Sequence, residues 1–339
     1  MAAEMTLKPR ILLITTGGTI TMTSGPGGSL ASPADRNCHL LEKIPELATL
    51  ATIEVLPLLN TDSSNLQPGT WVELARAVYD RMREYDGFVI THGTDTLSYT
   101  AAAIAFFLQD LGKPVVITGA QIPLEETGSD GRNNLINAFR TAVADIAEVV
   151  VVFGTQIIRG TRAKKTSVFD LQAFTSANAV PLGNIGLSLK FNREVQKRSK
   201  RKGLFLPHLD PNVARVPVYP GMKPEIIAYL MKHHHGIVVE GYGSGNIPTE
   251  ENSLIPVIRQ ATAKGVPIVI CTQCLVGSTE MELYQVGRAA LLAGAIPAMD
   301  MTPETTLVKL MWVLGQTSDV RMIDSLMQKS FAGELHSIL

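Results

Sequence analysis

Six short apolar runs, each ending in small polar residues, constrain the fold of this chain more than any other feature of its sequence. The runs span residues 11–19, 87–95, 114–121, 148–156, 236–246 and 266–274. Near-continuous β-branched runs of this kind are typical of strands buried on both faces, as in a parallel sheet. Helical patterns cover residues 70–85, 97–111, 133–147, 223–234, 281–293, 303–314 and 322–332. The alternation of strand and helix predicts an α/β fold.

The length and the charge distribution predict two domains. A chain of 339 residues, 45% of them hydrophobic, can bury a large core. Seven Lys or Arg lie between Lys190 and Lys202, which indicates a solvated interdomain loop, with a patch for an anionic partner as the alternative. We expect a larger N-terminal catalytic domain over 1–190, whose mainly parallel sheet is flanked by helices. A linker over 191–212 and a smaller C-terminal α/β domain over 213–339 follow.

The composition excludes several classes of protein. Lys and Arg number 30 and Asp and Glu 31, a formal net charge of −1, so the surface offers no general footprint for nucleic acid. The longest apolar run, 101–108, has eight residues, whereas a membrane-spanning helix needs about twenty. Only three cysteines occur, too few for a disulfide framework, and we see no export signal. The sequence predicts a cytoplasmic protein with no nucleic-acid or membrane partner.

The first apolar run ends in a group that can carry chemistry. It reads TTGGTI over residues 15–20. Its glycines allow a ligand to approach the backbone, and the hydroxyl of Thr19 is a potential nucleophile. The Gly-rich stretch over 21–33 predicts a mobile lid, because a nucleotide-binding fingerprint would need a helix there. A simple turn at Thr19 is the alternative.

The second apolar run ends in HGTDT over residues 92–96. Thr94 and Asp95 place a hydroxyl beside a carboxylate, at a strand end where they can lie close to Thr19. The alternative is that one of them caps the helix that follows. We expect His92 to be a structural hydrogen-bonding residue.

Two more polar segments contain side chains that can carry chemistry. RGTRAKK over residues 159–165 ends in lysines, and a desolvated lysine can act as a general base, although surface lysines are the plainer interpretation. NTDSSN over 60–65 supplies side-chain donors and acceptors, or is a helix-entry loop.

Neither of two metal-like motifs predicts a metal site. The side chains of three consecutive histidines, His233 to His235, point in different directions. Cys271 and Cys274 form a single C-x-x-C with no second pair, so two buried structural thiols are the better interpretation.

Taken together, these motifs resemble the bacterial-type L-asparaginases, in their cytoplasmic type I branch. The matching segments are TTGGTI at 15–20, DSS at 62–64, DGFVITHGTDTLSYTA at 86–101, KPVVITGAQIPL at 113–124, SDGRNNLINA at 129–138 and RGTRAKK at 159–165. GGTI and HGTDT in this order form a specific joint signal, and weaker similarity continues almost to the end of the chain. The resemblance implies hydrolysis of L-asparagine to L-aspartate and ammonia, for asparagine catabolism, without a metal or an organic cofactor.

The resemblance also implies a role for each motif. Thr19 would attack the side-chain amide and form an aspartyl ester, and Thr94, Asp95 and Lys165 would form a second catalytic group that activates the nucleophile or water. Thr94 and Asp95 would also bind substrate, Asp95 through the ammonium group, and N–H groups near Thr94 would face the oxyanion. The remaining implied substrate-binding residues are Ser63 and Ser64, which would bind the carboxylate, and Asn246. Because a neighbouring subunit approaches the site through the position of Asn246 in relatives, a homo-oligomer, dimer or tetramer, is implied.

Three positions depart from the family pattern. Ser29 stands where many relatives have a lid tyrosine, Glu240 stands where regulated relatives have an arginine at a second asparagine site, and Lys164 replaces a small hydroxylic residue. Allosteric activation is therefore not expected. Alternative interpretations are a non-catalytic amino-acid-binding or sensor protein, and the amidase subunit of a tRNA-dependent amidotransferase, although we expect no room for the extra N-terminal domain of that subunit. L-Glutamine as the main substrate also stays open.

Overall fold

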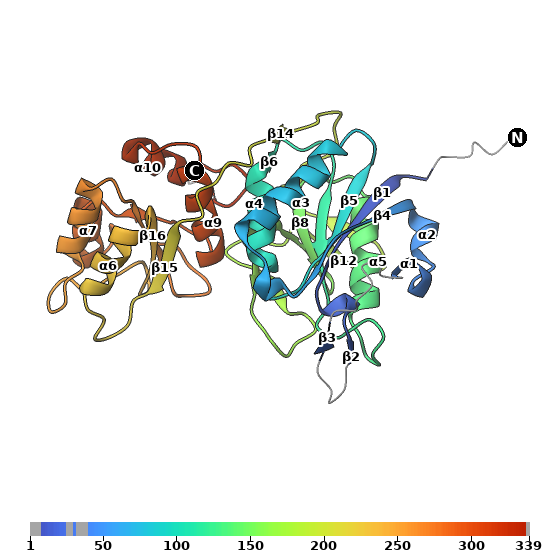
Figure 1. Cartoon of the computed structure of the whole chain (residues 1–339), viewed down its shortest axis with the longest axis horizontal. Coiled ribbons are helices and arrows are strands. Elements are labelled where there is room, and N and C mark those ends of the chain that lie inside the picture. Colours follow the sequence, from blue (N-terminus) through green and yellow to red (C-terminus); the bar gives the residue numbers. More distant parts are fainter. Residues whose placement is uncertain (1–7, 25–29, 32–39, 337–339) are drawn as a thin grey trace, which may run out of the picture. The chain divides into compact units, whose positions relative to one another are not determined.

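The computed structural model describes residues 8–24, 30–31 and 40–336. The chain forms two compact units (Figure 1). Unit 1 comprises Met1–Ser176 and Val180–Phe205, and unit 2 comprises Ala177–Ala179 and Leu206–Leu339. Unit 1 has a mainly parallel sheet and unit 2 a parallel sheet, each flanked by helices, so the predicted α/β class with a larger N-terminal part and a smaller C-terminal part is confirmed.

Unit 1 is built on an eight-stranded sheet in the order β13-β12-β9-β8-β7-β5-β1-β4. Its strands are β1 (Arg10–Gly17), β4 (Thr52–Thr61), β5 (Gly87–Thr91), β7 (Val115–Thr118), β8 (Val149–Phe153), β9 (Gln156–Arg159), β12 (Gly183–Ile185) and β13 (Leu189–Phe191). The pairs from β4 through β1, β5 and β7 to β8 are parallel, and β9, β12 and β13 extend the sheet antiparallel. The carboxyl ends of β1, β4, β5 and β7 therefore lie at one edge.

Strand β4 is absent from the sequence-based expectations. It is the last strand of the sheet, so it has a neighbouring strand, β1, on one side only. Nearly all of its residues are half-buried. It also contains Pro57. Proline has no backbone N–H to donate, and an edge strand tolerates it where no neighbouring strand needs that hydrogen bond. A strand of this kind lacks the continuous apolar pattern of a central strand.

Helices cover both faces of this sheet (Figure 1). They are α1 (Leu40–Lys43), α2 (Leu47–Leu50), α3 (Pro68–Asp80), α4 (Leu97–Phe107) and α5 (Gly131–Ala142). Helix α4 ends four residues before the predicted end at Leu111, because Leu108–Gln109 form strand β6, which pairs with β14 (Leu204–Phe205). Short pairs are also formed by β2 (Thr23–Ser24) with β3 (Leu30–Ala31), and by β10 (Ala163–Lys165) with β11 (Phe174–Ser176).

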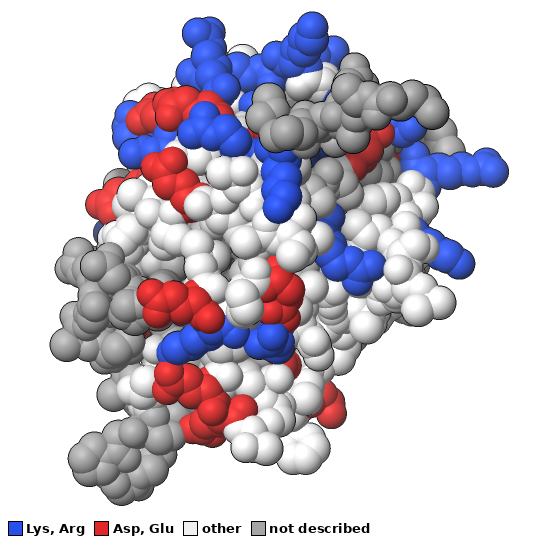
Figure 2. Space-filling view, turned by 90° about the vertical axis from the view of Figure 1, so that its right-hand side faces the viewer, with Lys and Arg blue, Asp and Glu red and all other residues white. Residues whose placement is uncertain are grey.

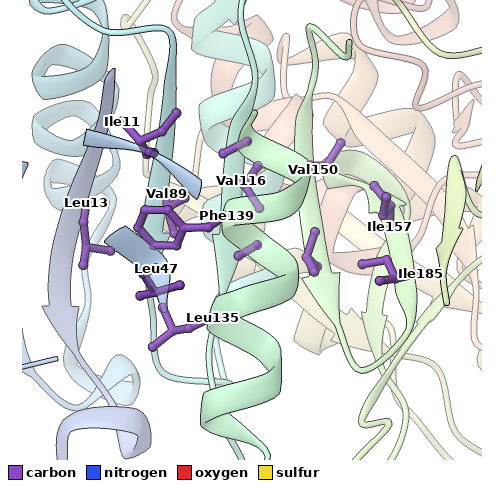
Figure 3. Packing of buried hydrophobic residues seen from close by; sticks show 14 of the residues in the cluster. Ile11, Leu13, Leu47, Val89, Val116, Leu135, Phe139, Val150, Ile157 and Ile185 are labelled. Carbon is purple, nitrogen blue, oxygen red and sulfur yellow. The ribbon is translucent and has the colours of Figure 1, made fainter. Parts of the chain in front are cut away.

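One face of the sheet packs against α5 and α2 (Figure 3). Phe139 of α5 and Leu47 of α2 are fully buried, as are Ile11 and Val89 on the strands beneath them. Full burial of side chains of this size stabilises a fold by about 1.5–3 kcal/mol each. This packing holds the strands, and hence the loops at their carboxyl ends, in fixed positions.

Part of the predicted linker lies along unit 1 rather than between the units. The carbonyl of Gln196 accepts a hydrogen bond from the Ala147 N–H at 2.8 Å, and the Ser199 N–H donates to Gly112 O at 3.0 Å. Figure 2 shows Lys and Arg gathered at the end of unit 1 where Figure 1 draws β6 and β14. The predicted domain boundaries themselves stay a prediction.

Unit 2 contains a parallel sheet in the order β15-β16-β17-β18. Its strands are β15 (Val213–Pro217), β16 (Gly236–Gly241), β17 (Ile268–Thr272) and β18 (Ile296–Pro297). Its helices are α6 (Glu225–His233), α7 (Ile255–Ala263), α8 (Gln285–Leu292), α9 (Pro303–Leu314) and α10 (Val320–Gln328). Helix α9 has its predicted bounds because Thr302 caps it by accepting from the Thr305 N–H, and Pro303 opens it.

A buried ion pair ties the end of the described chain to α9. Lys309 Nζ lies 2.7 Å from Glu334 Oε1, and both side chains are fully buried. Lys309 also donates to the carbonyl oxygens of Met327 and Lys329.

Among the helices described, none combines the length and the apolar character needed to cross a membrane.

Candidate active site

The loops that follow β1, β4 and β5 touch one another at the carboxyl edge of the unit 1 sheet. A Cβ atom added to Gly18 would lie 2.5 Å from the backbone nitrogen of Gly93, and one added to Gly93 would lie 2.6 Å from the Oγ of Ser63. Only glycine permits an approach this close. Because ligands of open α/β sheets bind at this edge, the predicted site residues of unit 1 lie where a ligand is expected.

Thr19 opens the short 3-10 turn η1 (Thr19–Thr21). It follows Gly18, whose φ of 81° lies in the left-handed region that favours glycine. The Thr19 side chain is half-buried, and its hydroxyl donates no hydrogen bond to any described residue. The predicted lid glycines and Ser29 lie outside the described residues.

Lys165 brings Thr94 and Asp95 into one group. Its Nζ lies 2.8 Å from Thr94 Oγ1 and 2.7 Å from Asp95 Oδ1. Thr94 is 6% exposed, the Lys165 side chain 19% and the Asp95 side chain 64%. A charge-assisted pair of hydrogen bonds therefore joins a buried hydroxyl to a carboxylate at the surface. The structure places these three sequence-predicted residues together.

Neither Thr94 nor Asp95 caps the helix that follows. Helix α4 begins at Leu97 with Thr96 in the N-cap position and no side-chain capping bond. The Thr96 hydroxyl instead donates to the carbonyl of Ser63 at 2.8 Å. The simpler capping interpretation is therefore wrong, and Thr94 and Asp95 are engaged with Lys165 instead.

Strand β10 delivers Lys165 to this group. It pairs antiparallel with β11, with Lys165 opposite Phe174 and Lys164 opposite Thr175. Successive side chains of a strand point to opposite faces, so Lys164 points away from the side on which Lys165 meets Thr94. The two adjacent lysines thus have different environments.

His92 is a buried structural residue, as predicted. Its Nδ1 lies 2.7 Å from the carbonyl oxygen of Gly93, and its Nε2 lies 2.8 Å from Thr100 Oγ1. Complete burial lowers the pKa of His92 to about 4, because the protonated form loses its hydration. A neutral ring donates from Nδ1 and accepts from the Thr100 hydroxyl, and this arrangement fixes the peptide that precedes Thr94.

Ser63 and Ser64 lie in the 3-10 turn η3 (Ser63–Asn65), in different environments. Ser63 is buried beside Gly93, whereas Ser64 is exposed. The Ser64 hydroxyl donates to Asp62 Oδ1 at 2.6 Å, and the Ser64 N–H donates to the same oxygen at 2.8 Å. These two bonds hold the pKa of the Asp62 carboxyl below its usual value. Ser63 packs directly against the loop that carries Thr94.

Sequence reasoning missed Gln121, which contacts Thr94, and Asp130, which holds the backbone of Gln121. Gln121 follows β7, and its Oε1 lies 3.3 Å from Thr94 Oγ1. The buried Asp130 precedes α5 and accepts hydrogen bonds from the N–H groups of Gln121 and Ile122. The available signal was the GAQ that ends the third apolar run, which resembles the other polar strand ends.

Unit 2 holds Asn246 and Glu240. Asn246 closes a turn with Tyr242, whose N–H donates to the Asn246 carbonyl at 2.8 Å, and its own Oδ1 is buried without a partner among the described residues. Glu240 Oε1 lies 2.7 Å from Arg215 Nε. The role of Asn246 toward a neighbouring subunit stays a prediction.

The histidine and cysteine motifs have structural environments. His233 packs against the ring of Tyr229, and His235 Nδ1 lies 2.6 Å from Asp210 Oδ2. No group of metal-binding side chains is found within residues 8–24, 30–31 and 40–336. Cys271 is buried, and burial raises its pKa to about 12, but Cys274 is exposed. The expectation of two buried thiols is therefore wrong for Cys274, which follows the end of β17.

Comparisons with known proteins place this arrangement in context. A family model described as "Asparaginase, N-terminal" matches residues 10–197, and one described as "Glutaminase/Asparaginase C-terminal domain" matches residues 212–327. The L-asparaginase of Thermococcus kodakarensis is 39% identical over 331 residues, which cover 96% of this chain and 99% of that protein. One of the subunits of the glutamyl-tRNA(Gln) amidotransferase of Pyrococcus furiosus is 40% identical over 339 residues, which cover 96% of this chain and 77% of that protein.

Solved structures agree with these matches. A structure described as the thermostable L-asparaginase from Thermococcus kodakarensis superimposes with a TM-score of 0.88 and 39% identity, covering 97% of this chain and 99% of that one. L-asparaginase I from Vibrio cholerae superimposes with a TM-score of 0.84 and 32% identity, with the same coverage.

Proposed function

The chain belongs to the asparaginase family of amide hydrolases, and from this premise we propose that it hydrolyses L-asparagine to L-aspartate and ammonia through an ester on Thr19. The observation that carries the proposal is the contact of Lys165 Nζ with both Thr94 and Asp95. A weak hydroxyl nucleophile needs a positioned group that accepts its proton, and these three residues form such a group at the sheet edge that holds Thr19.

In the proposed first half-reaction, the Thr19 oxygen attacks the side-chain amide carbon of L-asparagine. The C–N bond breaks, the nitrogen takes a proton and leaves as ammonia, and an aspartyl ester remains on Thr19. Water then attacks the ester carbon, the C–O bond to Thr19 breaks, the Thr19 hydroxyl is restored and L-aspartate is released. Backbone N–H groups near Thr94 stabilise the negative oxygen that forms in each half.

Thr94, Lys165 and Asp95 move the protons. Thr94 takes a proton from the attacking oxygen while its own hydroxyl proton passes to a neutral Lys165 amine. Asp95 then faces the new ammonium at 2.7 Å. A positioned acid or base of this kind contributes typically about 10²- to 10⁴-fold to the rate.

The two charged ends of the substrate determine where it binds. The Asp95 side chain, 64% exposed, accepts the substrate ammonium. Ser63 and Ser64 contact its carboxylate, for which the Ser64 hydroxyl turns away from Asp62. Ligands that lack either charged end leave these polar groups unpaired and are rejected.

A homo-oligomer, dimer or tetramer, completes the proposal. Val168 and Phe169 are each 90% exposed, only three and four positions beyond Lys165, and contiguous exposed apolar side chains mark interaction surfaces. A second copy of the chain that packs on this loop would bury both side chains. Asn246 of that copy is the residue that we propose to contact the site. Light scattering measures the oligomeric state, and we expect a Phe169→Glu variant to shift it toward the monomer.

We also propose a cytoplasmic location, which the sparse cysteines support.

A second candidate function is the amidase part of a tRNA-dependent amidotransferase. The likeness to one chain of such an enzyme, 40% identical, favours it. In that case, ammonia release would depend on glutamyl-tRNA(Gln). A non-catalytic amino-acid-binding protein is the third possibility, and it would release no ammonia from any amide.

Ammonia release distinguishes these functions. L-asparagine, L-glutamine and D-asparagine are supplied in parallel at millimolar concentration, with and without glutamyl-tRNA(Gln), to the wild type and to Thr19→Ala. The proposal predicts rapid release from L-asparagine alone, independent of tRNA and absent in Thr19→Ala. Release that needs tRNA, or no release from the folded protein, would reject it.

A further inference from the structure

The Gln121 side chain connects Thr94 with the loop that follows Lys165. Its Oε1 accepts from Thr94 Oγ1 at 3.3 Å, and its Nε2 donates to the carbonyl oxygen of Asp170 at 3.4 Å. Asp170 lies in the loop that follows the strand of Lys165. One side-chain amide therefore contacts both the hydroxyl and the segment beyond the lysine.

The carbonyl of Asp170 fixes which way the Gln121 amide points. A carbonyl oxygen only accepts hydrogen bonds, so it requires the NH₂ group of Gln121 on its side. The reversed amide would place two oxygen atoms against each other. Gln121 Oε1 therefore faces Thr94, and the Thr94 hydroxyl is the donor of that bond.

This arrangement sets the direction of the Thr94 proton. A hydroxyl has one donor and two acceptor positions. The Lys165 ammonium, which only donates, uses an acceptor position of Thr94 at 2.8 Å. The hydroxyl proton then has Gln121 Oε1 as its partner. The amide oxygen thus stabilises the state in which Lys165 carries the proton.

A buried carboxylate holds Gln121 in this place. Both oxygens of Asp130 accept from the Gln121 N–H at 3.0 Å, and one also accepts from the Ile122 N–H. Asn134 of α5 donates to Asp130 and to the Gly119 carbonyl, each at 2.9 Å. A Cβ atom on Gly119 would lie 2.3 Å from the carbonyl oxygen of His92. The loop after β7 is therefore fixed against the loop that carries Thr94.

We propose that Gln121 is a positioning residue for the reaction, and that it acts by accepting the Thr94 hydroxyl proton in a hydrogen bond once Lys165 is protonated. This inference rests on the proposed function. In the step concerned, the attacking oxygen gives its proton to Thr94 Oγ1, Thr94 gives its original proton to the Lys165 amine, and the amine becomes an ammonium beside Asp95. The Gln121 oxygen stabilises this product of the proton transfer without exchanging a proton itself.

Steady-state kinetics on three variants test the proposal. Gln121→Met keeps the side-chain length and removes both hydrogen bonds. Gln121→Glu keeps an acceptor for Thr94, but it replaces the donor to Asp170 with an oxygen and adds a negative charge. Gln109→Met is the matched control, because the Gln109 amide makes one hydrogen bond, to the carbonyl of Phe106, in a strand away from Thr94. Each is assayed for kcat and KM with L-asparagine, and its thermal midpoint is measured.

The proposal makes a graded prediction. We expect kcat of Gln121→Met to fall by about twofold to tenfold, the range that the loss of one ordinary hydrogen bond gives, with KM and thermal midpoint unchanged. Gln121→Glu recovers most of that loss, and Gln109→Met behaves as the wild type. Wild-type kcat in Gln121→Met, or an equal loss in Gln121→Glu, would overturn the role of Gln121 alone. A wild-type protein that releases no ammonia from L-asparagine would instead reject the proposed function.

Discussion

Removal of the Lys165 amine is the perturbation with the largest predicted effect on the proposed chemistry. Lys165→Met keeps most of the side-chain volume and removes contacts of 2.8 Å to Thr94 and 2.7 Å to Asp95. If the amine accepts the proton, kcat falls by about 10²- to 10⁴-fold, which corresponds to about 2.7–5.5 kcal/mol of transition-state stabilisation. KM does not rise, because Asp95 loses a competing cation and stays available for the substrate ammonium.

The same substitution has little effect on folding. Asp95 is 64% exposed, and ion pairs open to solvent contribute about 0–1 kcal/mol. Lys164→Met is the matched control, since its side chain points to the other side of β10. Ammonia release measures kcat and KM, and differential scanning fluorimetry measures the thermal midpoint. Unchanged kcat in a folded Lys165→Met variant, or an equal loss in Lys164→Met, would refute the reasoning.

Three further predictions concern the nucleophile, acid stability and the buried ion pair. Thr19→Ala abolishes ammonia release with an unchanged circular dichroism spectrum, while Thr19→Ser keeps part of the activity because it keeps a hydroxyl; full activity in Thr19→Ala would exclude this nucleophile. Because the folded-state pKa of His92 is about 4 and the unfolded value is near 6.5, the unfolded chain binds more protons between these values. The free energy of unfolding therefore falls by about 3 kcal/mol as the pH drops from about 6.5 to about 4. Denaturant titrations over this pH range should show that the free energy of unfolding of His92→Gln falls less with pH than that of the wild type. An equal pH dependence in the two proteins would contradict this role of His92. Lys309→Met leaves Glu334 buried and uncompensated and costs about 3–5 kcal/mol, and the double change Lys309→Met with Glu334→Met recovers most of the lost thermal midpoint; no recovery would mean that the pair is not the cause.

The central strands and the polar ends of unit 1 are the features that the sequence predicts best. A strand buried on both faces, such as β5 or β8, is continuous in apolar residues, so its position and its polar end can be recognised from the chain alone. Thr94 follows directly on such a run, whereas Lys165 comes after β9 has returned antiparallel along β8. Their contact, across 71 positions, was therefore implied by the family resemblance and not by the strand pattern.

Features that depend on tertiary context escape the same reasoning. Strand β4 pairs only with β1 and contains Pro57, so it has no distinctive pattern. Gln121 acquires its partner Thr94 only when Asp130, nine positions on, anchors the loop between them. The exposure of Cys274 likewise depends on where β17 ends. In each case the outcome depends on neighbours in the folded chain that the local sequence does not identify.

Chemical identification of the ester tests the central claim most directly. The protein is mixed with L-asparagine, quenched in acid within milliseconds and digested, and the peptides are examined by mass spectrometry, with Thr19→Ala treated in parallel. The account predicts an aspartyl adduct on the peptide that contains Thr19, which forms with a burst of ammonia and is absent from Thr19→Ala. An adduct on any other residue, or sustained ammonia release by Thr19→Ala, would contradict it.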